Sequence, residues 1–375
     1  MKIGIITQPL ENNYGGLLQN YALQEVLRRL GHAPITINQY WPLIPKKKFY
    51  IESAKNFIKK VLGRPYKPII YINDKELKAI SVNTQKFIQR HIIHTQRVTT
   101  EKEYRNVVIE NELKAIIVGS DQVWRPMYNR YLERSFLNFA KGLDIKRLAY
   151  AASFGVDTWE YNNIQTSICK ELANEFDAIS VREESAVGLC KKHLNCDAVF
   201  VLDPTMLLDK EDYIDIVESS NVEISKGNLF TYILDKNNEK QECIDKVAKK
   251  LNLTPFSVMP AKDKVFIKEN IDECVFPAVE CWLRAFIDAE FVICDSFHGA
   301  VFSIIFNKPF AIIGNKKRGM SRFDSLVKFF SLEDRLIYNT VDIDILRKNI
   351  DWKSVNEKRN AMKALSLNFI INNLK

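Results

Sequence analysis

The chain has 375 residues, 46% of them hydrophobic and 27% charged, which is the composition of an ordinary globular protein with room for two domains. Its net charge of +8 suits an anionic ligand or surface but is too small and too evenly spread to indicate a nucleic-acid-binding protein. The seven cysteines are scattered without metal-ligand spacing, which predicts reduced thiols, no metal site and a cytoplasmic location.

The first expected element is a strand over residues 2–7, KIGIIT, whose apolar run is too short for a signal peptide. A helix over 17–30 follows and ends at Gly31, since glycine is common just after a helix. A second strand covers 33–38. No apolar run in the sequence approaches the length of a membrane span.

From residue 99 onward, strand-like and helix-like segments alternate to the end of the chain. The first half has strands at 113–120, 147–155, 176–183 and 197–204, and helices at 99–110 and 181–194. The second half has strands at 228–234, 290–294 and 309–314, and helices at 238–251, 279–289, 299–306, from about 321, and at 353–373. This alternation is typical of parallel sheets with crossover helices. We therefore expect two doubly wound α/β domains, residues 1–204 and 205–375, that face each other across a cleft, and the last helix can pack back on the first domain.

One segment, residues 46–68, does not fit this alternation. Its apolar residues share one face of a helix, and lysines occupy the rest of the surface; the apolar residues are Tyr50, Ala54, Phe57, Ile58 and Val61. A basic amphipathic helix can lie on an anionic membrane surface, which predicts peripheral membrane contact. The alternative is a solvated helix that packs on its own domain.

The segment CDSFHGAVFSIIFNKPF, residues 294–310, joins a buried strand to an apolar helix, and His298 lies at the junction. Asp295 or Ser296 can cap this helix by accepting a backbone N–H. His298 is then either a plain first-turn residue or a site residue, because open α/β sheets bind ligands where strands end and helices begin. The helix dipole disfavours a charged imidazole there, which leaves a neutral ring able to exchange a proton.

Two further segments place site-like residues after predicted strands. Gly15 and Gly16 lie between a strand and a helix, where glycine lets the backbone approach a ligand closely. Arg182 directly follows a buried strand and can bind a carboxylate or phosphate with two hydrogen bonds. The alternative for Arg182 is an ion pair with Glu183 or Glu184.

The turn VGSDQVWRP gathers polar residues and an aromatic at the C-terminal edge of a strand. Ser120, Asp121 and Gln122 come first, and Trp124 follows. Sugar-binding sites often combine such groups, whereas the alternative is an ordinary capped turn.

Taken in order, these segments resemble the polysaccharide pyruvyl transferase family. The matching segments cover roughly residues 12–330: NYGGLLQNYALQ, GSDQVW, AYAASFG, SVREES, VLDPT, DSFHGAVFSIIFNKPF and GNKKRGMSRFDSL. The resemblance implies two facing Rossmann-like domains, similar to B-type glycosyltransferases. It also implies transfer of a pyruvyl group from phosphoenolpyruvate to two hydroxyls of a sugar, which forms a ketal and requires no metal or separate cofactor.

The resemblance also implies where the donor binds. Phosphoenolpyruvate is small and densely anionic, so we expect cationic residues and helix starts of the second half to hold it, with one arginine from the first half. The expected donor-binding residues are Arg182, Ser296, His298, Gly299, Lys317, Arg318 and Arg322. Some relatives carry an arginine two residues before the histidine, where this chain has Ser296, so another cation must serve the donor here.

The acceptor sugar is expected on the first half, which offers amides, a carboxylate and an aromatic ring. The expected acceptor-binding residues are Asn13, Tyr14, Gly15, Gly16, Gln19, Ser120, Gln122 and Trp124. His298 and Asp121 are the expected catalytic residues, because each step of ketal formation moves a proton. Which of them is acid and which is base stays open.

The predicted function is therefore a cytoplasmic pyruvyl transferase of exopolysaccharide or other glycan biosynthesis. Its partners are phosphoenolpyruvate and a sugar acceptor, either free or lipid-linked at the inner face of the membrane, and not nucleic acid. Two alternatives remain: a nucleotide-sugar glycosyltransferase of the same architecture, because fold does not fix the donor, and a non-catalytic carbohydrate-binding relative.

Overall fold

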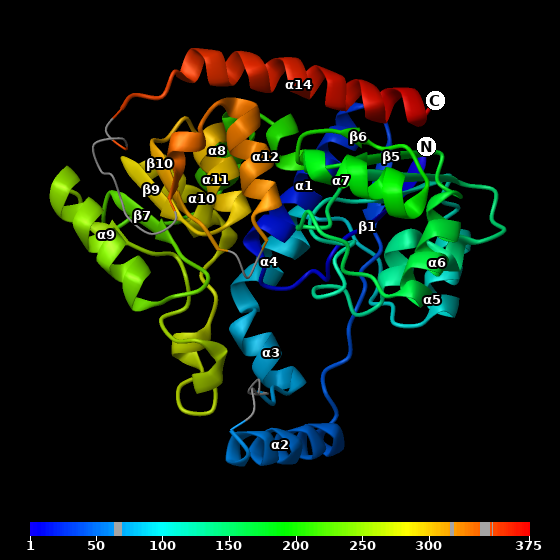
Figure 1. The fold of residues 1–375 in the computed structure, drawn as a ribbon, viewed down its shortest axis with the longest axis horizontal. Helices are drawn as coiled ribbons and strands as arrows, with labels where there is room; N and C mark the ends of the chain where they lie inside the picture. The colour runs from blue at the N-terminus through cyan, green and yellow to red at the C-terminus, as the bar shows by residue number, and fades with distance from the viewer. Residues whose placement is uncertain (64–69, 316–318, 338–345, 347) are drawn as a thin grey trace.

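The computed structural model describes all residues except 64–69, 316–318, 338–345 and 347. The described residues form two parallel β-sheets with helices packed around them (Figure 1). The first sheet belongs to the N-terminal half of the chain and the second to the C-terminal half, as the alternating sequence pattern predicts. We call these halves the first and second domains.

The first sheet has six described strands in the order β2-β1-β3-β4-β5-β6, and every pair is parallel. Its strands are β1 (Lys2–Ile6), β2 (Ala33–Thr36), β3 (Ala115–Val118), β4 (Lys146–Ala152), β5 (Ala178–Val181) and β6 (Val199–Phe200). All four residues of β3 are buried, because helices cover both faces of a parallel sheet. All the strands predicted for this half are present, although shorter than the sequence pattern suggested.

The second sheet has five described strands in the order β11-β10-β9-β7-β8, again all parallel. They are β7 (Leu229–Tyr232), β8 (Pro255–Phe256), β9 (Phe291–Cys294), β10 (Phe310–Ile313) and β11 (Leu336–Ile337). The two short strands, β8 and β11, form the edges of this sheet, and neither was predicted from the sequence.

Both sheets reverse their strand order at an equivalent place. In the first sheet the reversal lies between β1 and β3, and in the second it lies between β7 and β9. Open α/β sheets bind ligands outside the carboxyl ends of the strands at such a switch point. The topology therefore indicates two binding regions, one in each domain, before any side chain is considered.

The described helices connect these strands and pack against the sheets. They are α1 (Tyr14–Arg29), α2 (Lys46–Val61), α3 (Asp74–Ile80), α4 (Val82–His91), α5 (Glu101–Glu110), α6 (Asn163–Ala173), α7 (Glu184–Leu189), α8 (Lys210–Glu218), α9 (Asn238–Leu251), α10 (Val279–Asp288), α11 (Phe297–Ile305), α12 (Ser321–Phe330) and α14 (Trp352–Asn373). The bounds of α9 agree with the sequence prediction. None of the described helices is both long and apolar enough to cross a membrane.

The last helix, α14, runs along one edge of the molecule and contacts both domains (Figure 1). Lys358 donates to Ser331, which follows α12 of the second domain, at 2.7 Å. Ser366 accepts the backbone N–H of Leu202, next to the first sheet, at 3.1 Å. The chain thus crosses between the domains a second time, and the boundary that we predict after Pro204 lies between β6 and β7.

Candidate active site

A cleft of about 990 Å³ lies where the two switch points meet. Its first-domain wall comes from the loops after β1 and β3, and its second-domain wall from the loops after β7 and β9 and the start of α12. Six of its lining residues carry most of the polar chemistry near the centre: Asn13, Asp121, Gln122, Ser296, His298 and Arg322. The arrangement brings predicted donor and acceptor residues to one place.

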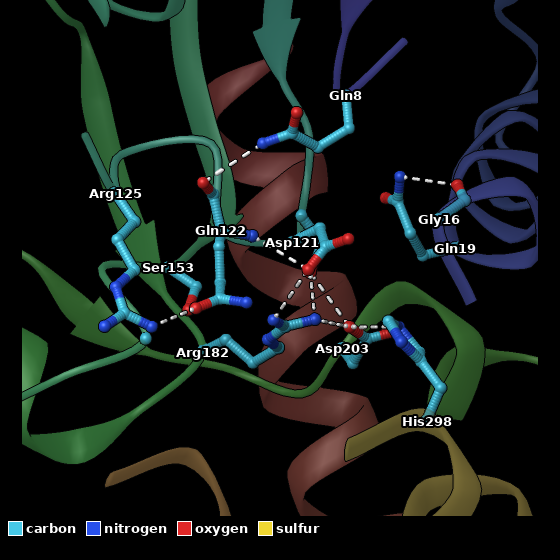
Figure 2. Close-up of polar contacts among 12 residues, drawn as sticks. Gln8, Gly16, Gln19, Asp121, Gln122, Arg125, Ser153, Arg182, Asp203 and His298 are labelled. Carbon is cyan, nitrogen blue, oxygen red and sulfur yellow. Dashed lines mark hydrogen bonds and ion pairs between the residues drawn. The ribbon is translucent and has the colours of Figure 1, made fainter. Parts of the chain in front are cut away.

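His298 lies in the first turn of α11, directly after β9. Ser296 is the N-cap residue of this helix, and its hydroxyl faces the backbone N–H of Gly299 at 3.5 Å. The His298 ring is nearly buried but lines the cleft. Among the described residues its Nε2 has no hydrogen-bond partner, although Asp203 Oδ2 lies 3.6 Å away (Figure 2).

The other ring nitrogen of His298 faces Gly15 of the first domain. A Cβ atom at Gly15 would stand 2.0 Å from Nδ1 and 2.2 Å from Cγ of His298, so only glycine fits there. The adjacent Gly16 is less constrained, since its Cβ would approach the end of the Asn13 side chain to 2.9 Å. Gly15 therefore has a steric role in the site, as its position in the sequence suggests.

Arg182 is the centre of a buried ion-pair network (Figure 2). Its Nη1 donates to Asp203 Oδ2 at 2.7 Å, and its Nη2 lies 3.4 Å from Asp121 Oδ1. Ser120 also donates to Asp203, at 2.9 Å. Burial alone would lower the pKa of Arg182, but the two carboxylates, with Glu183 nearby, raise it above its usual value.

Asp203 is the residue of this network that our sequence reasoning missed. It follows β6 in the motif VLDPT and is wholly inside the protein, where its second oxygen accepts from the backbone and hydroxyl of Thr205. Burial would raise the pKa of Asp203, but His298 and Arg182 hold it well below its usual range. The available signal was an acidic residue at the end of the predicted strand 197–204, of which β6 covers only Val199–Phe200.

Asp121 presents an ionised carboxylate to the cleft. It has a positive φ of 77°, which a non-glycine residue adopts only when its surroundings hold it there. Asn13 donates to Asp121 Oδ2 at 3.0 Å, and the Gln122 backbone N–H donates to Oδ1 at 2.8 Å. Burial would raise the pKa of Asp121, but Arg182, His298, Arg322 and the Gln122 N–H together outweigh this and lower it.

Arg322, in the first turn of α12, is a buried cation that lines the cleft from the second domain. Its guanidinium lies 5.7 Å from the centre of the Phe297 ring, and the guanidinium of Arg182 lies 4.3 Å from the same ring. Burial and repulsion from Arg182 lower the pKa of Arg322 to about 10. An anion bound beside Arg322 would favour its charged form.

Arg182 itself has a different place from the one that we expected. It is not among the cleft-lining residues, and both of its terminal nitrogens face carboxylates of the first domain. The alternative partner Glu183 is also wrong, because one Glu183 oxygen accepts hydrogen bonds from the loop at residues 153–155 instead. Arg182 is therefore placed to hold Asp121 and Asp203, rather than to meet a ligand directly.

Three other predicted site residues do not reach the cleft. Trp124 is fully buried in the first domain, where it stacks on Phe136 at 4.7 Å and donates to the Ser135 carbonyl, so it offers no surface to a sugar. Gln19 is also buried and donates to the carbonyl of Gly16, one turn earlier in α1, at 2.9 Å. Gly299 packs against β9, because a Cβ there would stand 2.7 Å from that of Cys294.

The remaining predicted residues fall into three groups. Tyr14 lines the cleft, and its hydroxyl donates to the Pro277 carbonyl at 2.8 Å. Ser120 is buried beneath the cleft in the Asp203 network. Lys317 and Arg318 lie outside the described residues. An aromatic that was not predicted, Trp41, does line the cleft.

No cluster of three or more His, Cys, Asp or Glu side chains that could hold a metal ion occurs within the part of the chain that the structure describes. The described site instead combines an imidazole, two ionised carboxylates and two guanidinium groups. These groups can bind an anion and move protons to or from a bound molecule.

Solved structures with a similar fold include nucleotide-sugar enzymes. UDP-GlcNAc 2-epimerase from Neisseria meningitidis bound to UDP-GlcNAc has a TM-score of 0.51 and 8% identity, with 100% of this chain and 99% of that chain covered. The Methanocaldococcus jannaschii UDP-GlcNAc 2-epimerase in complex with UDP-GlcNAc and UDP has a TM-score of 0.50 and 12% identity, with the same coverage. At this identity the likeness concerns the fold alone, which is two facing α/β domains as in B-type glycosyltransferases.

Sequence comparison adds the family. No curated protein matches the chain. A family model described as polysaccharide pyruvyl transferase matches residues 13–317, which include the glycine loop, the Asp121 turn, Arg182, Asp203 and His298. The match spans most of the 375 residues. The chain therefore belongs to the polysaccharide pyruvyl transferase family.

Proposed function

We propose that this transferase moves the pyruvyl group of phosphoenolpyruvate onto two hydroxyls of a sugar in a polysaccharide or glycan precursor. The donor's methylene carbon takes a proton and becomes a methyl group, and a sugar hydroxyl adds to the neighbouring carbon with loss of its own proton. Phosphate then leaves that carbon with the C–O bonding electrons, and a second hydroxyl replaces it and loses a proton. The products are a cyclic ketal and inorganic phosphate.

The position of His298 is the observation that carries this proposal. The His298 side chain lines the cleft, and its buried Nε2 has no hydrogen-bond partner among the described residues and lies 3.6 Å from the buried carboxylate of Asp203. The nearby carboxylate can fix the orientation of the ring, and an imidazole can hold a proton and release it to the donor's methylene carbon. We assign His298 this acid role.

We place the anionic donor against the starts of α11 and α12. The first backbone N–H groups of a helix attract anions, and Arg322 adds a buried positive charge beside them. Ser296 offers a hydroxyl at the same helix start. Arg182 supports this arrangement indirectly, because it fixes Asp203 under His298.

The acceptor is then expected on the first-domain wall. Asn13 and Gln122 offer amide groups there, and Trp41 offers an aromatic ring. Asp121 is ionised and can accept a hydrogen bond from an attacking hydroxyl, although its lowered pKa makes it a weak base. We propose that phosphoenolpyruvate is the second substrate and that the reaction uses no cofactor.

We propose a cytoplasmic location, which is where phosphoenolpyruvate would be met. All seven cysteines are unpaired, as is usual for proteins of a reducing compartment.

The main alternative is a nucleotide-sugar glycosyltransferase, since structures of similar fold bind UDP-GlcNAc or UDP. The two functions differ in the small product that they release. Incubation with phosphoenolpyruvate and a panel of glycan-precursor sugars should release inorganic phosphate and yield a product with a new ketal methyl group by NMR. His298→Gln should abolish both signals in a folded protein, and His32→Gln, distant from the cleft, should not. Nucleoside diphosphate release from a nucleotide sugar, without phosphate release from phosphoenolpyruvate, would instead favour the glycosyltransferase.

A further inference from the structure

Helix α2 stands apart from the two domains. Figure 1 shows it at the end of the molecule opposite α14, beyond α3. None of its residues is buried, although it is 16 residues long and contains seven aromatic, isoleucine, valine or alanine residues. A surface helix of this composition normally buries its apolar face against its own protein.

The exposed side of α2 is its apolar side. Tyr50, Phe57 and Val61 share one face and are 67%, 67% and 70% exposed, and Ile58 beside them is 57% exposed. The less exposed residues lie on the opposite side, at helical spacing: Phe49, Glu52, Ser53 and Asn56. Phe49 contacts Tyr71 there, at a ring-centre distance of 5.4 Å. The helix therefore turns its more polar side toward the chain and its apolar side outward, the reverse of a helix that packs on its own domain.

The charge of α2 indicates which kind of partner can cover this apolar face. Its residues 46–61 contain six lysines and one acidic residue, Glu52. A second copy of this helix would bring lysines against lysines, which opposes self-association. An anionic lipid surface matches both features, because it accepts apolar side chains at the acyl boundary and attracts lysines at the headgroups.

Described residues on both sides of α2 in the sequence line the cleft. Trp41, which precedes the helix, and Ile72, which follows it, both line the cleft wall. A surface that binds α2 would therefore lie near the cleft.

We propose that α2 docks this protein on an anionic membrane, with Tyr50, Phe57, Ile58 and Val61 in the interface and the lysines toward the headgroups. The part of the predicted contact segment at residues 64–68 lies outside the described residues, and the proposal does not need it. It has one consequence that rests on the proposed function: the acceptor is a lipid-linked sugar, reached from the membrane surface.

Co-sedimentation with vesicles tests the docking without any catalysis. The wild-type protein should bind vesicles of phosphatidylcholine with phosphatidylglycerol and should bind pure phosphatidylcholine much more weakly. Phe57→Asp with Ile58→Asp should weaken binding to the mixed vesicles about tenfold or more, and Lys59→Glu with Lys60→Glu should do the same. Both pairs are exposed, so circular dichroism and the melting temperature should stay at wild-type values.

Matched controls carry the same chemical changes elsewhere. Ile164→Asp alters an isoleucine of α6 that is 73% exposed, and Lys246→Glu with Lys249→Glu alters two exposed lysines of α9. These variants should bind as the wild type does. Equal loss in the controls, or no binding of the wild type to the mixed vesicles, overturns the proposal. So does an α2-dependent change in oligomeric state without vesicle binding, which would assign the face to a second copy of the chain.

The vesicle result is independent of the proposed function. His298→Gln should abolish pyruvyl transfer and leave vesicle binding unchanged, whereas the α2 variants should keep donor binding. Failure of the proposed function would therefore appear as absent phosphate release with normal vesicle binding, and failure of the docking as the opposite pattern.

Discussion

Gly15 of the first domain lies directly against the imidazole of His298 of the second domain, so close that a Cβ at Gly15 would stand 2.0 Å from Nδ1. On the other side of the ring, Asp203 of the first domain lies 3.6 Å from Nε2. His298 is thus enclosed by residues of the opposite domain. Its orientation depends on how the two domains dock, which makes the cleft a composite site rather than a feature of either half.

Gly15→Ala should displace the His298 ring and reduce the turnover number by about a hundredfold, because a shift of about 1 Å in a catalytic group has effects of that size. The melting temperature should fall only slightly, since a domain contact can open by the small distance required. Gly188→Ala in α7 is the matched control, because no heavy atom lies within 4 Å of the added Cβ. Wild-type turnover in Gly15→Ala would show that the position of His298 does not matter.

Asp203→Asn should reduce the free energy of unfolding at pH 7 by about 3 kcal/mol, because Arg182 then loses its closest carboxylate inside the protein. The pKa of Asp203 is lower in the folded protein than its unfolded value of about 4, so its stabilising charge is fully present above that pH. The difference from wild type should shrink as the pH falls below about 4. Denaturant titrations at several pH values measure it.

The control for this comparison is Asp197→Asn, which breaks an exposed ion pair with Lys191 and should change stability by less than about 1 kcal/mol. A stability difference for Asp203→Asn that does not depend on pH would show that its ionisation is not what stabilises the fold.

Arg182→Lys should destabilise the protein by about 2 kcal/mol, although it keeps the charge, because an ammonium group cannot bridge Asp203 and Asp121 as the guanidinium does. The Michaelis constant for phosphoenolpyruvate should rise less than turnover falls, because Arg182 does not line the cleft. Thermal unfolding and steady-state kinetics decide this, with Arg28→Lys on the surface of α1 as the control. A large rise in the Michaelis constant at unchanged stability would instead indicate that Arg182 contacts the donor directly.

Alanine substitutions at Trp124 and at Trp41 should have opposite effects on stability and on acceptor kinetics. Trp124→Ala should cost about 3–5 kcal/mol of stability, because it removes a fully buried ring from the core of the first domain. Trp41→Ala should leave the fold stable but raise the Michaelis constant for the acceptor, since Trp41 lines the cleft. Melting temperatures and acceptor kinetics for the pair test the assignment. It is wrong if Trp41→Ala loses stability without any kinetic effect.

The architecture was predictable because its signal is local. Buried strands such as FVIC at β9 and the amphipathic pattern of α9 each follow from the period of apolar residues. The edge strands β8 and β11 were missed because two paired residues leave no period to detect. The cleft position of His298 was also predictable, since a strand C-terminus meets a helix N-terminus there.

The partners of the site residues were not predictable, because they come from distant parts of the chain. Arg182 pairs with Asp203 and Asp121, which are 21 and 61 residues away, rather than with the adjacent Glu183. Trp124 has the polar neighbours of a sugar site, yet packing against Phe136 places it in the core. The depth of a side chain after a strand depends on what tertiary structure covers it, and a single sequence does not contain that.

The predicted division into a donor half and an acceptor half is also only partly consistent with the geometry. Gly15, predicted for the acceptor, lies against His298, predicted for the donor. The two predicted sets of residues therefore meet at this contact between the domains.

Calorimetric titration of phosphoenolpyruvate, with UDP-GlcNAc as the competing ligand, tests the central claim that the cleft holds an anionic pyruvyl donor beside His298 and Arg322. The account predicts that phosphoenolpyruvate binds the wild-type protein and that UDP-GlcNAc does not. It also predicts that Arg322→Met weakens phosphoenolpyruvate binding about tenfold or more, because a charge-assisted contact is lost. Binding of UDP-GlcNAc with no heat from phosphoenolpyruvate, or equal phosphoenolpyruvate affinity in folded Arg322→Met, would contradict it.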